Sequence, residues 1–499
     1  MPSDSMFLFH DKTQYVRVAE FTNAITSLHI PPVYAAHFNF GIGYPVFLFY
    51  APVAYWITAL IHILGFGVVN AVRLSMLAAL LVGAWGMYAW LTKRYARPAA
   101  FVGAMLFVSS PWVASEIFVR GNLATIWFLA LAPWSLWSLW LMHKRSIAPI
   151  FLIPLTLMTH NVLSLLWIPI LFVYAFFGFT HKRVYRMKFL ILTTLISAVF
   201  WIPALTQLAQ TYASDIAKLT RYSDHFLCLS QIWTTPSWGF GGSTPGCTAD
   251  GMSFMLGKLQ IMCAILGLIA GSFVFQKKKS LFVEGLIVLW ALFLTLPDSA
   301  PFWRLLPPLQ VIQFPWRFLS IALIFSASLS AAAIQVLIEH IKIVTVRDKM
   351  SLNKTYKTMV HKMYRSVPRS WFRKGFDVRQ LPVPPFSQTT YVSVCMIFVI
   401  TIVLISAKYF YGKTVPLDDF ERLYTSNAYT AQSAAYEIPE YVPKTVDYSY
   451  WQRFRGEKPS PDDITRLTKD FAAFRPQPLI QVMSSLIALS SVILILWLL

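Results

Sequence analysis

The residues best suited to chemistry lie in the first 46 positions, ahead of the first long apolar block. Asp11 stands there beside His10, and Arg17 follows a short distance later. A carboxylate in a loop that rests on a membrane can accept a proton, or bind a divalent cation such as Mg²⁺ or Mn²⁺, next to a substrate at headgroup depth. The alternative is that Asp11 caps the following helix, because Asp is a preferred N-cap residue.

Two later arginines, Arg120 and Arg317, border predicted membrane spans. A guanidinium can bind a lipid phosphate through two parallel hydrogen bonds and keeps its charge while doing so. Either arginine could equally be an interfacial anchor or part of a structural ion pair. Trp316 could provide a platform for a sugar, although a belt of aromatic residues at the membrane interface explains it as well.

Thr159, His160 and Asn161 interrupt the apolar block 147–179. Unpaired polar groups are costly in lipid, so we expect His160 and Asn161 to face the bundle interior or a wet cavity. A histidine satisfied by core partners is the alternative to a substrate-binding one. The block is either one kinked span or two short helices that meet near a membrane face.

The composition indicates the elements that must position these residues. The chain has 499 residues, of which 57% are hydrophobic and 13% are charged, and a soluble protein cannot bury so much apolar surface. The apolar blocks match the thickness of a bilayer and do not alternate as barrel strands do. We therefore predict an all-α polytopic transmembrane bundle of eleven or twelve spans. They lie near 47–66, 71–92, 97–113, 122–142, 147–179 (one or two), 188–208, 254–275, 282–297, 318–340, 391–410 and 478–499.

The loops divide the chain into a segment 1–46, a transmembrane core 47–340, a basic loop 341–390 and a C-terminal part 391–499. Two further loops, 209–253 and 411–477, are long enough to hold structure, and the second is predicted to form a small ordered cap. The formal charge of +20 is carried by clusters between apolar blocks. The positive-inside rule explains such clusters better than nucleic-acid binding does.

The charge clusters give only a partial topology. Basic residues at 181–183, 277–279 and 341–379 are expected in the cytosol, with loops 209–253 and 411–477 outside. Lys93-Arg94 and Lys144-Arg145 also look cytosolic, which would place residues 1–46 inside unless the parity of the first spans is misjudged. Cys228 and Cys247 could form a disulfide if their loop is extracytoplasmic.

Five short motifs, in order, resemble a family of bacterial multispan proteins named 6-pyruvoyl-tetrahydropterin synthase-related membrane proteins. They are HDKTQYVRVAEF with FGIGYPVFLFYAPVAYW, Phe118-Val119-Arg120-Gly121, Thr159-His160-Asn161, the PPLQVIQFPWRF loop from Pro307 to Phe318, and the segment from Glu437 to Pro443. The layout is similar to that of the GT-C superfamily, whose members transfer sugars from polyprenyl phosphates.

The resemblance implies a GT-C-like fold in a bacterial cytoplasmic membrane, with a lipid-linked sugar as substrate and membrane lipids as surroundings. Asp11 would then be the base or help to bind a cation, while Arg17, Arg120 and Arg317 would hold the lipid phosphate at the outer face. Two departures stand against it. Family members begin with a span before the acidic loop, so we expect either that the true start lies upstream of Met1 or that the protein is a truncated relative. The second departure is Thr125, which stands where an acid is expected.

Two other classes of function fit a chain of this kind. A lipid or polysaccharide transporter would show inverted repeats with paired broken helices, and the sequence has one broken block without a partner. A non-catalytic membrane scaffold descended from a glycosyltransferase is favoured by Thr125 and by the absent first span. The sequence indicates neither the sugar, nor the metal requirement, nor the oligomeric state.

Overall fold

The computed structural model describes residues 5–7, 9–142, 146–179, 181–219, 221–235, 242–275, 279–310, 312–352, 385–432 and 434–498. The basic loop predicted at 341–390 lies for the most part outside these residues. In the described part, regular structure is helical apart from one small sheet, in which β1 (Ser5–Phe7) pairs antiparallel with β2 (Thr414–Pro416). The predicted all-α membrane bundle is confirmed.

Six helical segments of the described chain are long and apolar enough to cross a membrane, and two bent pairs raise this number to eight. The six are α4 (Val68–Leu91), Arg97–Arg120, α7 (Leu123–Leu141), Pro315–Ile341, Val392–Tyr409 and α26 (Pro478–Leu498). The bent pairs are α10 (Arg183–Ile196) with α11 (Ala198–Leu208), at 61°, and α15 (Lys279–Thr295) with Pro297–Leu305, at 94°. Shorter apolar helices are α3 (Val53–Ile63), α8 (Ala148–Leu157), α9 (Asn161–Phe177) and α14 (Lys258–Val274).

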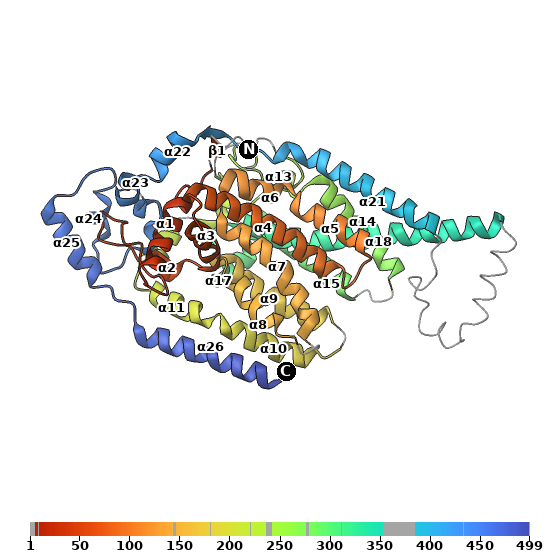
Figure 1. Cartoon of the computed structure of the whole chain (residues 1–499), viewed down its shortest axis with the longest axis horizontal. Coiled ribbons are helices and arrows are strands. Elements are labelled where there is room, and N and C mark those ends of the chain that lie inside the picture. Colours follow the sequence, from red (N-terminus) through yellow and green to blue (C-terminus); the bar gives the residue numbers. More distant parts are fainter. Residues whose placement is uncertain are drawn as a thin grey trace.

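Helix α18 (Phe318–Leu352) is the centre of the bundle. It packs against α14, α15 and α5 (Arg97–Val108), and its first turns are almost fully buried (Figure 1). A Cβ at Gly267 of α14 would overlap the carbonyl oxygen of Leu329, so the glycine allows the two backbones to approach closely. Such small residues at helix contacts are typical of membrane bundles, where van der Waals packing drives association.

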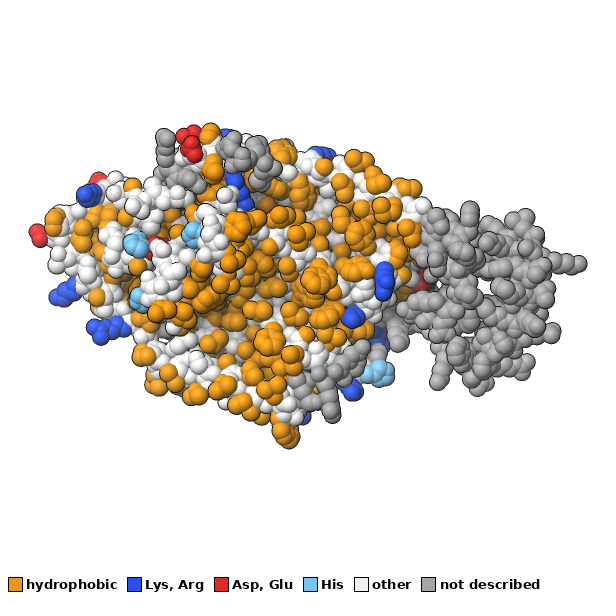
Figure 2. Space-filling model, viewed as in Figure 1, with side chains coloured by type: hydrophobic (Ala, Val, Ile, Leu, Met, Phe, Trp, Pro, Cys, Tyr) orange, Lys and Arg blue, Asp and Glu red, His pale blue; other side chains and the backbone are white. Residues whose placement is uncertain are grey.

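The outer surface of the bundle is apolar in a way that suits lipid. Helix α26 lies along α10 and α11 and exposes a row of large side chains that includes Leu479, Leu486 and Leu494. Figure 2 shows hydrophobic side chains over the middle of this face, with lysines and arginines mostly toward its margins. Such an apolar surface is favourable against lipid tails and unfavourable in water. The chain is therefore an integral membrane protein.

The apolar block predicted as a first span at 47–66 does not form one continuous helix. It contains α2 (Val46–Phe49), the turn Tyr50-Ala51-Pro52 and α3, which has only 11 residues. About 20 helical residues are needed to cross a bilayer, so α3 alone is too short. Both the start of α3 and the start of α4 lie near the N-terminal segment, as the hydrogen bonds of Tyr55 and Arg73 show.

This break corrects the parity of the first spans. Of the helices between residues 9–46 and Lys93-Arg94, only α4 is long enough to cross a bilayer, so residues 9–46 lie at the opposite end of the bundle from that basic pair. Arg94 contacts Glu284 and Ser280 near the start of α15, which places Lys279 at the same end as Arg94. We call this the basic end, and we call the end that contains residues 9–52 the N-terminal end.

The block 147–179 is two helices rather than one kinked span. Helix α8 ends at Leu157 and α9 begins at Asn161, where the ring of His160 accepts hydrogen bonds from the backbone N–H groups of Val162 and Leu163. The imidazole therefore caps α9, because it satisfies donors that a helix start leaves unpaired.

A folded cap covers the N-terminal end of the bundle. It includes α22 (Leu417–Tyr424), α23 (Asn427–Gln432), α24 (Tyr448–Gln452) and α25 (Pro461–Ala472), and Figure 1 shows it around α1 (Gln14–Thr26) and α2. Trp451 is fully buried and donates from its indole to Asn39 at 2.9 Å. The cap thus packs as part of the protein core.

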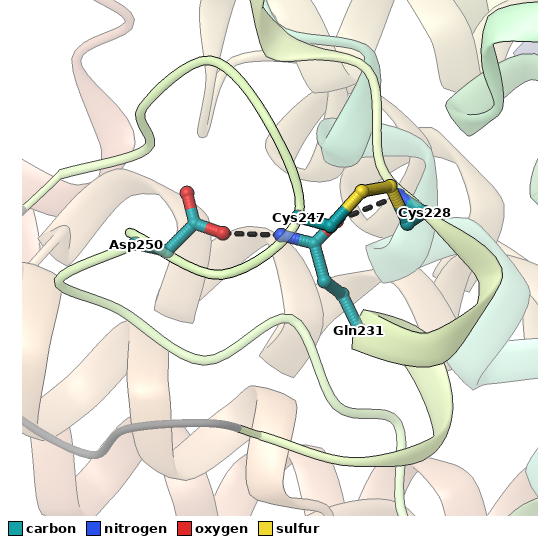
Figure 3. Close-up of a disulfide and its surroundings, with 4 residues drawn as sticks. All are labelled: Cys228, Gln231, Cys247 and Asp250. Atoms are coloured by element: carbon teal, nitrogen blue, oxygen red, sulfur yellow. Dashed lines mark hydrogen bonds between the residues drawn. A yellow bond between two sulfur atoms is a disulfide. The ribbon is translucent and has the colours of Figure 1, made fainter.

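Loop 209–253 is closed by a disulfide between Cys228 and Cys247, whose Cα atoms are 5.6 Å apart. The same loop is braced by Gln231, which accepts from the backbone N–H of Cys228 and donates to Asp250 (Figure 3). A bond from Trp316 to Ser243 ties this loop to the start of α18, at the N-terminal end.

Candidate functional site

The segment that carries Asp11 is attached directly to the end of the span Arg97–Arg120. The backbone N–H groups of His10 and Asp11 donate to the carbonyl oxygens of Val119 and Arg120, each at 2.9 Å. Gly121 follows with a positive φ of 62°, and a Cβ there would overlap the ring of Phe9. The Phe-Val-Arg-Gly motif is therefore the place where the N-terminal loop and a span are joined.

The Asp11 carboxylate is held by three donors. It accepts from Gln14 at 2.7 Å, Arg17 at 3.1 Å and Thr13 at 3.2 Å, and its side chain is 24% exposed. Asp11 is not the N-cap of α1, because that position belongs to Thr13. The capping alternative is therefore wrong, and Asp11 instead organises the turn that precedes the helix.

The Arg17 guanidinium is hydrogen-bonded to residues of this turn. Its guanidinium donates to Asp11, to Thr13 and, at 3.1 Å, to the hydroxyl of Tyr55, and it lies 4.6 Å from the centre of the Tyr50 ring. Only 2% of its side chain is exposed. A phosphate could reach Arg17 only by displacing these partners, so its position suits support of Asp11 better than the substrate binding expected from the sequence.

Arg120 is paired with Glu116, a residue that the sequence analysis did not single out. One terminal nitrogen of Arg120 lies 2.7 Å from both carboxylate oxygens of Glu116, whose side chain is fully buried. The guanidinium also lies 4.6 Å from the ring centre of Trp316. The spacing of four residues in a helix was the available signal, because it places both side chains on one face.

Thr125 stands where the resemblance led us to expect an acid. Its backbone N–H bonds to Asn122, which caps α7, and its side chain hydrogen bonds to the Glu116 carboxylate. A carboxylate therefore does lie at this position in space, supplied by the preceding helix rather than by residue 125.

Arg317, unlike the other two arginines, forms no ion pair among the described residues. One of its terminal nitrogens donates to the carbonyl oxygen of Ile312 at 2.6 Å, while its buried Nε has no hydrogen-bond partner among the described residues. Its electrostatic neighbours are Arg120 and Glu116, with Tyr50 and Tyr441 beyond them. Arg317 is also partly accessible, so a bound anion could satisfy donors that the protein leaves open.

Trp316 is almost completely buried, with 3% of its surface exposed. Arg120 lies against its ring and its indole N–H donates to Ser243 at 3.3 Å. The side chain therefore orients Arg120 and holds the disulfide loop, and little of it is left to form the sugar platform considered from the sequence.

His160 and Asn161 reach the same region from α9. His160 uses Nδ1 to cap the helix, which leaves the proton on Nε2, and its ring lies within electrostatic range of Arg317 and Arg120. Asn161 accepts from Ala51 at 2.8 Å and donates to Phe49 at 2.5 Å, so it fixes the turn that carries Tyr50. Both polar side chains lie inside the bundle, as expected for an interrupted apolar block, and Asn161 is satisfied there by backbone groups.

The segment from Glu437 to Val442 is the part of the cap that packs against this region. Tyr44 donates to the carbonyl oxygen of Ile438 at 2.6 Å, and Tyr441 stacks on Phe49 and meets the edge of Tyr50. Burial raises the pKa of Glu440 above its ordinary value of 4.5. The motif noted in the sequence therefore lies against the turn Tyr50-Ala51-Pro52.

The donor set around Asp11 does not suit a metal ion. Among the described residues there is no group of three or more His, Cys, Asp or Glu side chains that could hold one. The carboxylate of Asp11 is already paired with the Arg17 guanidinium, which would repel a cation. We derive no step through a metal.

The structure thus places Asp11, Arg120, Arg317, Trp316 and His160 at one end of the bundle. Arg17 and Asn161 hold the backbone around them.

A comparison with known families matches residues 47–352 to the profile of one family, described as "6-pyruvoyl-tetrahydropterin synthase related domain; membrane protein". The matched stretch runs from α2 to the end of α18, so it includes Arg120, His160, Trp316 and Arg317. No curated protein and no solved structure matches the chain.

Proposed function

The chain belongs to the family of 6-pyruvoyl-tetrahydropterin synthase related membrane proteins, and we propose that it is a membrane glycosyltransferase that uses a polyprenyl-phosphate sugar as donor. The reaction would take place at the outer face of a bacterial cytoplasmic membrane. The family description supports the membrane location, whereas the proposal for the chemistry rests on the N-terminal end of the bundle.

The observation that carries the proposal is the excess of positive charge around Arg317. Arg120 and Arg317 lie near one another, and Glu116 is the one carboxylate among the strongest electrostatic neighbours of Arg317 in the described part of the chain. A lipid phosphate that leaves a sugar gains negative charge in the transition state. Fixed guanidinium groups aimed at such developing charge are an effective form of catalysis in a site shielded from water.

Two features support the outer face as the location. The disulfide Cys228–Cys247 belongs to the loop that is tied to Trp316, and disulfides persist in oxidising compartments. Arg94, Arg183 and Lys279 gather instead at the basic end, where the positive-inside rule predicts the cytosol.

In this proposal Arg317 binds the phosphate with its unpartnered Nε and a terminal nitrogen. Arg120 adds charge, and the Nε2–H of His160 is an additional donor within range. Asp11 holds the Arg17 guanidinium, and Arg17 in turn packs against the ring of Tyr50.

A transporter is the rival function from another class. It needs a pathway that reaches both ends of the bundle, whereas Arg94 and Glu284 form a buried, fully bonded network at the basic end. That network favours a site open at one end only. A scaffold without catalysis is distinguished by the experiment below.

The experiment measures release of polyprenyl phosphate from radiolabelled undecaprenyl-phosphate glucose and undecaprenyl-phosphate mannose, in membranes of cells that express the chain. We expect release with the wild type, loss of release with Arg317→Gln and slower release with Asp11→Asn, each at equal expression. Asp215→Asn is the matched control, because Asp215 lies in an exposed ion pair with Lys444. No release by the wild type with either donor, or full activity of Arg317→Gln, would contradict the proposal.

A further inference from the structure

Glu440 is a largely enclosed but partly accessible carboxylate that forms no ion pair among the described residues. The hydrogen bond that influences its carboxylate comes from its own backbone N–H. A buried carboxylate without a paired donor is costly, so its presence calls for a physical reason. Stability of the cap alone does not supply one.

The backbone that carries Glu440 is held firmly on both sides. Ile438 accepts from Tyr44, and Val442 accepts a backbone bond from Tyr212 at 3.0 Å. Pro443 forms a bridge with Thr211. A side chain on such a support keeps its position relative to the bundle, as a reacting group must.

The surroundings of Glu440 are those of the proposed site. Its electrostatic neighbours include Asp11 and Arg17, and it acts in turn on Tyr50 and Tyr441. Glu440 lies deep in the protein yet keeps part of its surface accessible to water. A small hydroxyl can therefore reach its carboxylate.

Asp11 is less suited to accept a proton, because Gln14, Arg17 and Thr13 already donate to its oxygens. Removing Asp11 from that role would leave the reaction without a base unless another carboxylate is present.

We propose that Glu440, and not Asp11, accepts the proton of the acceptor hydroxyl during sugar transfer, an inference that rests on the proposed function. Burial, which favours the neutral form of a carboxyl group, makes this group a stronger base than an exposed glutamate.

The step balances as follows. The acceptor O–H bond breaks and its proton moves to a carboxylate oxygen of Glu440. The acceptor oxygen forms a bond to the anomeric carbon of the sugar, and the bond from that carbon to the phosphate oxygen breaks. Its electron pair leaves with the polyprenyl phosphate, so the phosphate gains the negative charge that Glu440 loses, and the arginines stabilise the product.

The test compares Glu440→Gln with Glu437→Gln in full-length protein in nanodiscs, using the same undecaprenyl-phosphate sugars and total membrane extract as the source of acceptor. Glu437 is the matched control, because it is an exposed glutamate of the same segment whose contact with Lys12 is 3.9 Å long. We expect Glu440→Gln to lower kcat about 100-fold or more with an unchanged KM for the donor. Glu437→Gln should stay within about twofold of the wild type, as expected for an exposed charge.

A pH profile separates this role from a positioning role. In the wild type the rate should fall at acid pH as Glu440 becomes protonated, and the residual rate of Glu440→Gln should lack this acid limb. Asp11→Asn should be slow but should keep the limb. The inference would be overturned if the wild type transfers sugar and Glu440→Gln is also active. It would likewise be overturned if the residual rate of Glu440→Gln keeps the acid limb. Either result would leave the proposed function intact. A wild type without transfer would instead overturn the proposed function itself.

Discussion

Two buried arginine–glutamate pairs stand at opposite ends of the bundle, and they are built differently. At the basic end, Arg94 pairs with Glu284, which also accepts from Tyr174 at 3.0 Å and from Ser328 at 2.9 Å. Arg94 donates further to Tyr95. One positive and one negative charge are thus enclosed with their hydrogen bonds satisfied.

At the N-terminal end, Glu116 pairs with Arg120 while Arg317 lies nearby with a buried Nε that no described residue accepts from. Here two guanidinium groups lie near one buried carboxylate. Burying an unbalanced charge is costly unless a ligand compensates for it. The same pair of residue types can therefore form a neutral, hydrogen-bonded network at one end of the bundle and, at the other end, belong to a cluster whose excess positive charge suits an anion.

The largest expected contrast comes from removing one arginine at each end. Arg94→Gln leaves Glu284 buried and unpaired, so it should lower the free energy of unfolding by about 3–5 kcal/mol. Arg317→Gln should not lower that free energy, because relief of the unbalanced positive charge offsets the lost hydrogen bond to Ile312. It should instead reduce donor turnover about 100-fold. Tryptophan-fluorescence unfolding in detergent and the release assay measure both quantities, and a large loss of stability in Arg317→Gln would break the comparison.

Removing both partners at the basic end tests whether Arg94 and Glu284 are energetically coupled. The double substitution Arg94→Met with Glu284→Met should be more stable than Arg94→Gln by several kcal/mol, because no charge is then left unpaired in the bundle. A double-mutant cycle in the same unfolding assay checks this. Equal stability of the single and double variants would show that the pair is not coupled.

A smaller effect is expected from the disulfide that braces Trp316. The bridge spans 19 residues, and opening it should lower the free energy of unfolding by about 3 kcal/mol by the loop-entropy relation. Cys228→Ser with Cys247→Ser, compared with Cys263→Ser as a control thiol, tests this under oxidising conditions. A reducing agent should then destabilise the wild type alone, and equal sensitivity of the double variant would contradict the expectation.

The smallest expected effect concerns pH. The pKa of Glu440 is raised by burial above its value of 4.5, so the folded state binds its proton more tightly than the unfolded chain does. Stability contributed by this group is therefore present below about pH 4.5 and is lost as the pH rises toward the folded pKa. Glu440→Gln should consequently unfold at a higher temperature than the wild type at pH 8, and the difference should shrink at pH 4. The opposite trend would show that the carboxylate is stabilised in its charged form.

The helical class and most of the apolar segments could be predicted from the sequence, because a bilayer imposes length and composition on each segment separately. The caps that Asn122 and Ser110 form were not predicted from the sequence, although both residue types are favoured at helix starts. The break at Tyr50-Ala51-Pro52 was visible as a proline in an apolar run, but its consequence for topology depended on where α3 and α4 begin in space.

The candidate site could be predicted only in part. Asp11, Arg120 and Arg317 were found because a carboxylate and guanidinium groups that border spans could act on a substrate at headgroup depth, and the structure places them at one end. The pairing of Arg17 with Tyr55, and the access of Glu440 to the same region, depend on contacts between residues far apart in the chain. No local pattern encodes such contacts.

The most direct test of the account is equilibrium binding of undecaprenyl phosphate, measured by native mass spectrometry with purified protein. The account predicts that Arg317→Gln weakens binding about tenfold or more, since a charge-assisted contact to phosphate is lost. Arg304→Gln, which removes an exposed arginine from the neighbouring helix, should bind as the wild type does. Equal affinity of the wild type and Arg317→Gln would contradict the claim that the unbalanced charge at the N-terminal end is a phosphate site.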